Sequence, residues 1–348
     1  MNEQQFLAIL ESHLQKINEQ ERADIRRDFE EYFENGRAEG KTTEEIIHSF
    51  GDMDELAKEL LASYDEEDFV QAVVLEKKDI DVPYRKVKVK ANIVNLSIVA
   101  TDADEAMIET NNKDQAIETS LTIENDTLVV KVAQEEKVRR FWFITIVGSV
   151  DKVNAILHLP KKHYEKLVVE NQNGSIKVSD INAAQFDLQS DNGRVMTNAI
   201  QGDNLYAHSD NGRIILENSA VQRVKASSNN GRVVVENCRG QQFKLDSSNG
   251  RVQLKDIDAQ VEAYSSNGRI EAQFAQVSHP VSLKTENGRI ELSTLRKLEN
   301  VLIEGTTSWG STTMYNVQTS RYEHGTKEHK VHLKTSNGKI IVEEVGAQ

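Results

Sequence analysis

The sequence of 348 residues predicts a mainly β protein, a parallel β-helix preceded by a small all-α domain. Three observations predict this fold: a repeat of about 19 residues in the second half, strict alternation of apolar residues within each repeat, and helical apolar spacing near the start. A fixed repeat of this length is typical of solenoids, in which each coil contacts only its neighbours. We expect right-handed winding.

Asn-Gly pairs mark the repeat. The first seven are spaced 19, 19, 19, 19, 18 and 20 residues apart, and six of them continue into arginine. Glycine permits the positive φ that we expect at this corner, and the asparagine amides can hydrogen-bond to one another in a ladder. The Ser or Thr hydroxyls two residues before each of these asparagines can likewise form hydrogen bonds with buried polar groups. The ladder comprises Asn173, Asn192, Asn211, Asn230, Asn249, Asn267, Asn287 and Asn337.

Apolar residues occupy every second position around each pair. Leu205 and Ala207 precede Asn211, and Ile214 and Leu216 follow it. Asn-Gly between alternating strands also signals a β-hairpin, so a hairpin meander is the alternative. The likeness of equivalent positions favours the β-helix, because stacked rungs place like side chains above one another. A third apolar position indicates that the return segment also reaches the core: Ile181, Ile200, Cys238, Ile257 and Leu295.

The residue after each pair predicts an exposed basic row with one charge per coil. The row comprises Arg194, Arg213, Arg232, Arg251, Arg269, Arg289 and Lys339. One interpretation is a solvated face that blocks aggregation. The other is a sensor site for a linear anionic ligand, either an envelope polymer or the lipid headgroups of an anionic membrane surface, because guanidinium groups suit phosphate and carboxylate.

Beside the basic row, outward positions carry apolar residues. They are Met196, Ile215 and Val234 in adjacent coils and Ile341 near the end. Apolar residues on an outer face predict that another part of the chain, or a partner, packs there.

The opening segment is acidic. Residues 1–68 contain 7 Lys and Arg and 20 Asp and Glu, so their net charge of 7 − 20 = −13 accounts for most of the −14 of the chain. Phe6, Leu10 and Leu14 recur at helical spacing, and Thr42 with Glu45 forms a capping-box pattern. We expect this segment to dock a basic or regulatory protein. Nucleic acid is not an expected partner, because the acidic domain would repel phosphates.

These patterns divide the chain into five parts. We expect a four-helix domain over 1–64, a charged linker over 65–82, and irregular strands over 83–165 that begin and cap the solenoid. Regular coils follow over 166–293, and a cap with the last coil over 294–348. Within this cap, Ser308-Trp309-Gly310-Ser311 is expected to form a degenerate corner before the last regular rung at Asn337.

Two parts of the chain resemble known families. The run Asp28-Phe29-Glu30-Glu31-Tyr32-Phe33, with Phe50-Gly51-Asp52-Met53-Asp54-Glu55-Leu56-Ala57, resembles the HAAS-type helical signalling domain of mainly Gram-positive bacteria, which is associated with PadR-like transcriptional regulators. Val153-Asn154-Ala155-Ile156-Leu157-His158-Leu159-Pro160 and Asn173-Gly174-Ser175-Ile176-Lys177-Val178 are similar to the bacterial β-helix family of candidate adhesins, which includes the YvlB, LiaG and LiaX groups of envelope-stress proteins. The resemblance implies a non-enzymatic role in envelope stress or signalling and supplies no site residues.

The apolar run from Phe141 to Val150 is expected to be one strand buried on both faces. The alternative is a membrane-touching loop, with Arg139 and Arg140 at lipid phosphates and Trp142 at the interface. The run is about half as long as a membrane span, and the start of the chain lacks the features of a signal peptide. We therefore expect a cytoplasmic protein, with a position at the inner face of the membrane as the alternative.

Catalytic chemistry is not indicated by the sequence. Outward acidic residues are scattered over different rungs, so a polysaccharide-active β-helix enzyme is only a remote alternative. The single cysteine, Cys238, falls at an apolar core position. We expect neither a metal nor a cofactor.

Overall fold

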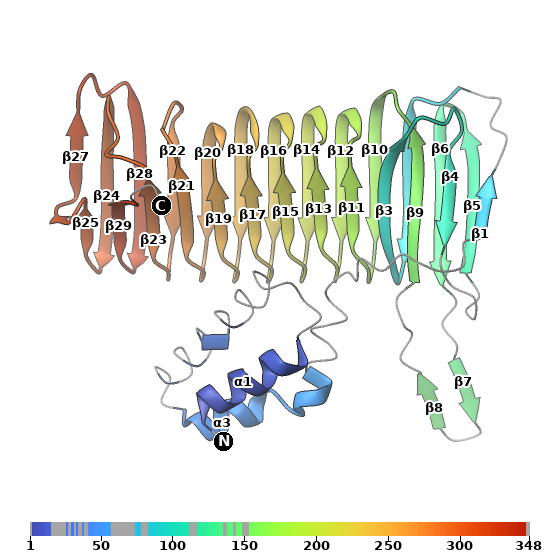
Figure 1. Ribbon diagram of the computed structural model, residues 1–348, viewed down its shortest axis with the longest axis horizontal. Helices are drawn as coiled ribbons and strands as arrows, with labels where there is room; N and C mark the ends of the chain where they lie inside the picture. The colour runs from blue at the N-terminus through green and yellow to red at the C-terminus, as the bar shows by residue number, and fades with distance from the viewer. Residues whose placement is uncertain are drawn as a thin grey trace. The chain divides into compact units, whose positions relative to one another are not determined.

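The structure is a computed structural model, and it describes residues 2–14, 26, 29–30, 33, 37, 41–56, 74–77, 83–110, 117–134, 138–141, 144–147 and 153–345. The chain divides into two compact units, Met1–Val70 and Gln71–Gln348. Figure 1 shows the elements of each unit.

The first unit is helical where it is described. It contains α1 (Glu3–His13) and α3 (Thr43–Ser49) around a small apolar core. The Phe6 ring lies 5.1 Å from the ring of Phe50 and 5.6 Å from that of Phe33, measured between centroids. The predicted capping box is confirmed: the Thr42 hydroxyl accepts a hydrogen bond from the backbone N–H of Glu45, and the backbone of Thr42 donates to the Glu45 carboxylate. These bonds lower the pKa of Glu45. Much of the rest of the expected four-helix domain lies outside the described residues.

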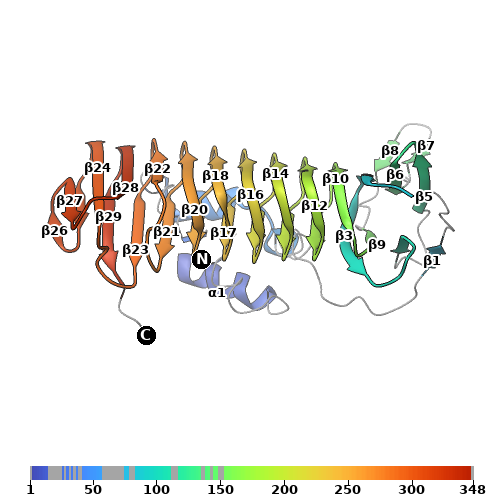
Figure 2. The same ribbon diagram turned by 90° about the horizontal axis from the view of Figure 1, so that it is seen from above.

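The second unit contains two long sheets that run side by side (Figures 1 and 2). Sheet A contains, in spatial order, β1 (Val74–Lys77), β4 (Met107–Thr110), β9 (Val153–Pro160), β3 (Val94–Thr101), β11 (Ile176–Ser179), β13 (Val195–Asn198), β15 (Ile214–Glu217), β17 (Val233–Glu236), β19 (Val252–Lys255), β21 (Ile270–Phe274), β23 (Ile290–Thr294), β29 (Ile340–Glu344), β25 (Thr312–Met314) and β26 (Val317–Gln318). Sheet B contains β27 (Arg321–His324), β24 (Val301–Trp309), β28 (His329–Asn337), β22 (Val281–Thr285), β20 (Asp258–Ser265), β18 (Arg239–Ser247), β16 (Ala220–Ser228), β14 (Gln201–Ser209), β12 (Asn182–Ser190), β10 (His163–Asn171), β2 (Lys86–Asn92), β6 (Thr127–Gln134) and β5 (Ile117–Glu124).

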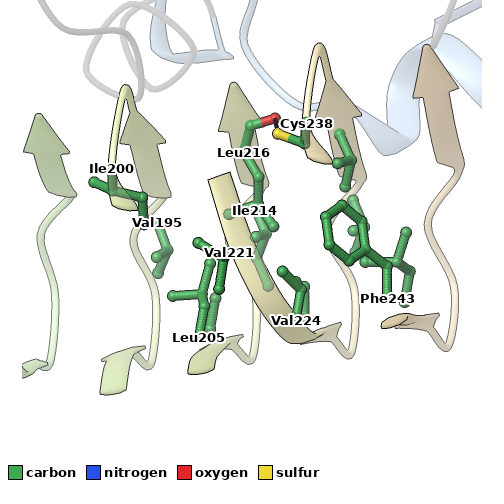
Figure 3. Close-up of a cluster of buried hydrophobic side chains, with 14 of the residues drawn as sticks. Val195, Ile200, Leu205, Ile214, Leu216, Val221, Val224, Cys238 and Phe243 are labelled. Atoms are coloured by element: carbon green, nitrogen blue, oxygen red, sulfur yellow. Dashed lines mark hydrogen bonds between the residues drawn. The ribbon is translucent and has the colours of Figure 1, made fainter. Parts of the chain in front are cut away.

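The predicted β-helix is confirmed, and the hairpin meander is excluded. Each strand pairs in parallel with its equivalent in the next coil, so that Phe186 pairs with Leu205 and Leu205 with Val224. The alternating apolar side chains are buried between the two sheets (Figure 3). Of the predicted third apolar row, four members are buried, but Leu295 is 45% exposed because it lies beyond β23, where the chain leaves the regular coils.

The asparagine ladder is also confirmed. The amide Nδ2 of Asn211 donates to Oδ1 of Asn192 at 2.7 Å, and Asn230 donates to Asn211 in the same way. The pattern continues to Asn337, whose Nδ2 donates to Asn287. Every asparagine of the predicted ladder therefore bonds to the next along the solenoid.

The expected reason for the glycines was wrong. None of the Asn-Gly glycines from Gly174 to Gly338 has a positive φ; they are required because successive backbones approach closely. A Cβ at Gly231 would lie 1.9 Å from the carbonyl oxygen of Gly212. The Ser228 hydroxyl fits the remaining space, donating to that oxygen at 3.0 Å and accepting from the N–H of Gly231 at 2.8 Å. Glycine and serine together thus tie each coil to the one before it.

Left-handed backbone occurs instead at the second corner, where each sheet A strand returns to sheet B. The residues with positive φ there are Asp180, Ala199, Asn218, Asn237 and Asp256. Asp and Asn tolerate this conformation through their short polar side chains, whereas Ala199 at φ 54° carries steric cost.

The C-terminal coils are out of chain order. In sheet B, β28 lies between β22 and β24, and in sheet A, β29 lies between β23 and β25, so the last strand pair in the chain is inserted before the pair that precedes it. The degenerate corner is confirmed, because Trp309 aligns with Asn337. Antiparallel β26 and β27 cover the outermost strands.

The N-terminal strands begin the solenoid as expected. β2 and β3 pair in parallel with β10 and β11 on one side and with β6 and β9 on the other. β6 and β9 therefore end the parallel stack, and β5, β4 and β1 add antiparallel strands beyond it. Residues 74–77 of the expected linker thus form a strand.

The prediction of one continuous strand from Phe141 to Val150 was wrong over the described residues, whereas residues 142–143 and 148–150 lie outside them. The chain forms an antiparallel pair instead, β7 (Val138–Phe141) and β8 (Ile144–Val147), which is a separate two-stranded sheet. An apolar run without alternation does not indicate where the chain reverses.

Candidate functional site

The arginine row lies on the outer face of sheet A, beside the Asn-Gly corner. Adjacent members belong to paired coils: the backbone N–H of Val195 donates to the carbonyl oxygen of Arg213, and that of Ile214 to the oxygen of Arg232. The prediction of an exposed row was wrong at its centre, since Arg232 and Arg251 are only 7% and 6% exposed. Arg194, Arg213, Arg269 and Arg289 are half-buried, and Lys339 is exposed.

The side chains of the row bend along the sheet toward polar neighbours. Nη1 of Arg232 donates to Oε1 of Gln253 in the next coil at 3.4 Å. Glu271 lies 3.6 Å from Arg251 and 2.7 Å from Arg269, measured between charged atoms. This charge pairing explains how guanidinium groups are accommodated with so little exposure. It also leaves fewer guanidinium hydrogens for a linear anionic ligand.

Three predicted apolar residues form one continuous strip on the same face. Met196 pairs with Ile215, and Ile215 with Val234, in β13, β15 and β17. All three are half-buried. Ile341 does not join this strip, because β29 pairs with β23 and β25. We call Met196, Ile215 and Val234 the apolar strip.

The apolar strip has charged borders. The arginine row runs along one side, and Glu217 and Glu236 lie two residues beyond Ile215 and Val234 in the same strands. Glu236 forms an ion pair with Lys255 at 2.6 Å. A short apolar centre with polar edges is the usual composition of a protein recognition surface.

A groove along the second corner was not anticipated. Its volume is about 430 Å³, and it is lined by Ala199, Ile200, Gln201, Asn218, Ser219, Ala220, Asn237, Cys238, Arg239, Asp256 and Asp258. Cys238, one of the lining residues, is 4% exposed, and burial raises the pKa of its thiol to about 11. Cys238 is therefore a buried core residue, as the sequence predicts. The alternation of apolar residues does not indicate this groove, whose lining includes the small side chains of Ala199 and Ala220.

The predicted membrane contacts fall in the separate hairpin. Arg139 and Arg140 belong to β7, whereas Trp142 lies outside the described residues. Among the residues that the structure describes, no helix has the length and apolar character needed to cross a membrane. The same residues contain no cluster of three or more His, Cys, Asp or Glu suited to a metal ion.

A family model described as Toastrack DUF4097 matches residues 84–343, which include all of the parallel coils. The chain belongs to the Toastrack DUF4097 family. A second model, HAAS, matches residues 5–59, so both resemblances seen in the sequence are confirmed. No curated protein matches this Toastrack chain.

Solved structures similar to this Toastrack protein share little sequence with it. A candidate adhesin from Bacteroides fragilis is 13% identical with a TM-score of 0.40, and the match covers 78% of this chain and 98% of that chain. A candidate lipid-binding protein from Parabacteroides distasonis is 13% identical with a TM-score of 0.44 and coverages of 77% and 96%. A candidate cell adhesion protein from Clostridium sporogenes is 10% identical with a TM-score of 0.26 and coverages of 79% and 99%.

Proposed function

We propose that this protein acts by binding, without catalysis, in bacterial envelope-stress response or signalling. The solenoid supplies the interaction surface, and the acidic helical unit docks a regulatory protein. The apolar strip carries this proposal, because Met196, Ile215 and Val234 are half-buried outward residues aligned in three successive coils.

The strip is suited to recognise a partner with high specificity. Neighbouring strands are about 4.8 Å apart, so three residues in register form an apolar line of roughly 10 Å. The backbone beneath it is fixed by the Gly and Ser contacts of each coil, so little conformational entropy is lost on binding. The flanking arginines and glutamates would fix the orientation of the bound partner.

The composition of the helical unit supports the second half of the proposal. Residues 5–59 match the HAAS model, and the net charge of −13 over residues 1–68 favours a basic partner surface. An anionic polymer along the arginine row has less support, because Arg232 and Arg251 at its centre are buried and Glu271 contacts Arg251.

Site-specific photo-crosslinking of the full-length protein in the native bacterium tests this proposal. A photoreactive phenylalanine analogue at Ile215 or Val234 should capture one defined protein, and more of it during cell-wall stress. The control is the same analogue at Lys225, which lies on the outer face of sheet B. Equal labelling at all three positions, or none at the strip, would contradict the proposal.

A second measurement separates binding from regulation. The double variant Ile215→Asp/Val234→Asp should abolish capture at the remaining strip position Met196. If envelope-stress gene expression then stays as in the unmodified strain, the binding is real but the assigned role in the stress response is wrong.

A further inference from the structure

The apolar strip is the middle of a longer straight column of outward residues. The strands β11, β13, β15, β17 and β19 pair in parallel without a shift in register. Their central outward residues therefore lie one above another: Lys177, Met196, Ile215, Val234 and Gln253. A polar residue thus stands at each end of a linear apolar surface.

The spacing of the apolar strip matches one face of an α-helix. Neighbouring strands are about 4.8 Å apart, so Met196, Ile215 and Val234 extend over roughly 10 Å. The helix positions i, i+3 or i+4, and i+7 are about 5 Å apart along the axis and also extend over about 10 Å. An extended segment fits less well, because it gains its backbone hydrogen bonds at the edge of a sheet and not on its face. A helix along the stack would place one apolar residue on each member of the strip.

The charges beside the strip lie where the flanks of such a helix would be. Arg213 and Glu217 are two residues to either side of Ile215, and both are half-buried. Glu236 continues the acidic border in the next coil, where Arg232 is only 7% exposed. Two strand residues span about 7 Å, and a helix with its side chains is about 10–12 Å wide. A helix with acidic residues on one flank and basic residues on the other would therefore be attracted on both sides.

A second copy of this chain would oppose like charges on this face. A two-fold axis can superimpose two strips in a face-to-face pair in two ways. With the axis along the strands, Arg213 would face Arg213, and Glu217 would face Glu217. With the axis along the stack, Lys177 would face Lys177, and Arg251 would face Lys255. The charges of the strip therefore favour a different protein.

Given the proposed binding function, on which this inference rests, we propose that the partner of the apolar strip is an amphipathic α-helix that lies along the stack. Its acidic flank lies over the arginine row, and its basic flank lies over Glu217 and Glu236. Lys177 sets the direction of the helix, because it is exposed, it continues the strip at one end, and a cation is favourable beside a helix C-terminus. The C-terminal end of the bound helix lies toward Lys177, and its N-terminal end toward Gln253.

Photo-crosslink mapping with the full-length protein in the native bacterium tests the helix and its direction. The photoreactive phenylalanine analogue is placed at Val234, Ile215 or Met196 in three strains, and the captured residues of the partner are identified by mass spectrometry. One coil spacing of about 4.8 Å corresponds to about three residues of a helix but to only one or two of an extended segment. Each step from Val234 to Met196 should therefore move the captured position about three to four residues toward the C-terminus of the partner.

Two synthetic peptides test the charged borders on the unmodified protein. Both are helices of about 16 residues with leucine at i, i+3 or i+4, and i+7, and they differ only in which flank holds glutamate and which holds lysine. One peptide should bind about tenfold more tightly than the other in fluorescence anisotropy, because the exchange sets like charges against both borders. The double variant Ile215→Asp/Val234→Asp should bind neither peptide.

A single charge reversal tests the direction of the helix. Lys177→Glu should weaken binding of the preferred peptide, amidated at its C-terminus, by about threefold, because it places an anion beside the negative end of the helix dipole. The matched control is Lys225→Glu, an exposed lysine on the outer face of sheet B, which should leave binding unchanged. Both variants should keep the urea midpoint of the unmodified protein, because both side chains are exposed.

The outcomes separate this inference from the proposed function. Capture of a protein without the spacing of three to four residues overturns the helix and leaves the proposed function standing. Capture of a second copy of this chain at the strip also overturns the helix. No capture from any of the three positions overturns both. Equal affinity of the unmodified protein for the two peptides overturns the charged borders, and an equal effect of Lys177→Glu and Lys225→Glu overturns the assigned direction.

Discussion

Replacing Gly231 by alanine tests why glycine is required at the Asn-Gly corner. The new Cβ would lie 1.9 Å from the carbonyl oxygen of Gly212, about 1.5 Å closer than ordinary contact at 3.4 Å. The obstructing atom is backbone, held in place by the Ser228 hydroxyl, so the coils must separate locally. We expect a loss of about 3 kcal/mol or more, at the upper end of the range for overpacked cores.

Urea unfolding followed by far-UV circular dichroism measures this loss. Because solenoid coils are coupled only to their neighbours, hydrogen exchange of peptides from β14 to β18 should show the largest increase at the altered coil. Gly231→Asn should be as harmful as Gly231→Ala, since close approach excludes any Cβ. In contrast, Ala199→Gly at the second corner should stabilise by about 0.5–1 kcal/mol, because it relieves a left-handed alanine.

Two results would refute this reasoning. One is an unchanged midpoint for Gly231→Ala. The other is tolerance of Gly231→Asn together with damage from Gly231→Ala, which is the signature of a left-handed glycine rather than of close approach.

Further predictions concern the buried polar groups. Ser228→Ala leaves two buried backbone groups without their side-chain partner and should lower the free energy of unfolding by about 2–4 kcal/mol in urea denaturation, whereas Ser228→Thr should restore most of it, as the equivalent Thr285 suggests. Cys238 should resist iodoacetamide at pH 8 until the protein is unfolded. The pKa of the Cys238 thiol is higher in the folded protein than in the unfolded chain, so its neutral form contributes fully to the free energy of unfolding below the unfolded pKa. This contribution of about 2–3 kcal/mol should be lost between about pH 9 and pH 11. The variant Cys238→Ala should not show this loss. Glu271→Gln, which affects two poorly exposed arginines, should cost about 1–3 kcal/mol in the same urea assay, and Glu291→Gln, beside the 42% exposed side chain of Arg289, less than about 1 kcal/mol. Equal costs for the two glutamate variants would contradict the burial argument.

The solenoid could be predicted because its signal repeats. Each repeat shows the same apolar pattern again, as at the equivalent residues Leu205 and Val224. The inward positions and the length of a coil can therefore be derived from the repeat period alone. The asparagine ladder follows in the same way, since equal spacing places Asn192 beside Asn211.

The errors concern features that a period does not specify. Glycine is required both where the backbone has a positive φ and where two backbones approach closely. The residue type at Gly231 therefore does not show which of the two reasons applies there. The exposure of Arg251 depends on how its side chain lies toward Glu271 in the next coil, which residue type alone does not determine. Nothing in the residue type of Ala199 indicates left-handed backbone.

The spatial order of the C-terminal coils could not be predicted either, because the sequence offers two equivalent corners. Gly310 and Gly338 both occupy corners, and either could follow Gly288 in the stack. The structure places Gly338 above Gly288 and Gly310 above Gly338.

The inserted strand pair also has a consequence for the synthesis of the protein. Coils up to β22–β23 can join the stack as the chain leaves the ribosome, because each pairs with strands that have already been translated. The β24–β25 coil cannot join the stack at that moment, since its docking surface, β28 and β29, is translated later. A chain interrupted before β28 would therefore keep an open sheet edge at β22 and β23, which marks it for aggregation or proteolysis. The C-terminal coils can therefore complete the stack only after the ribosome has synthesised β29, which ends at Glu344.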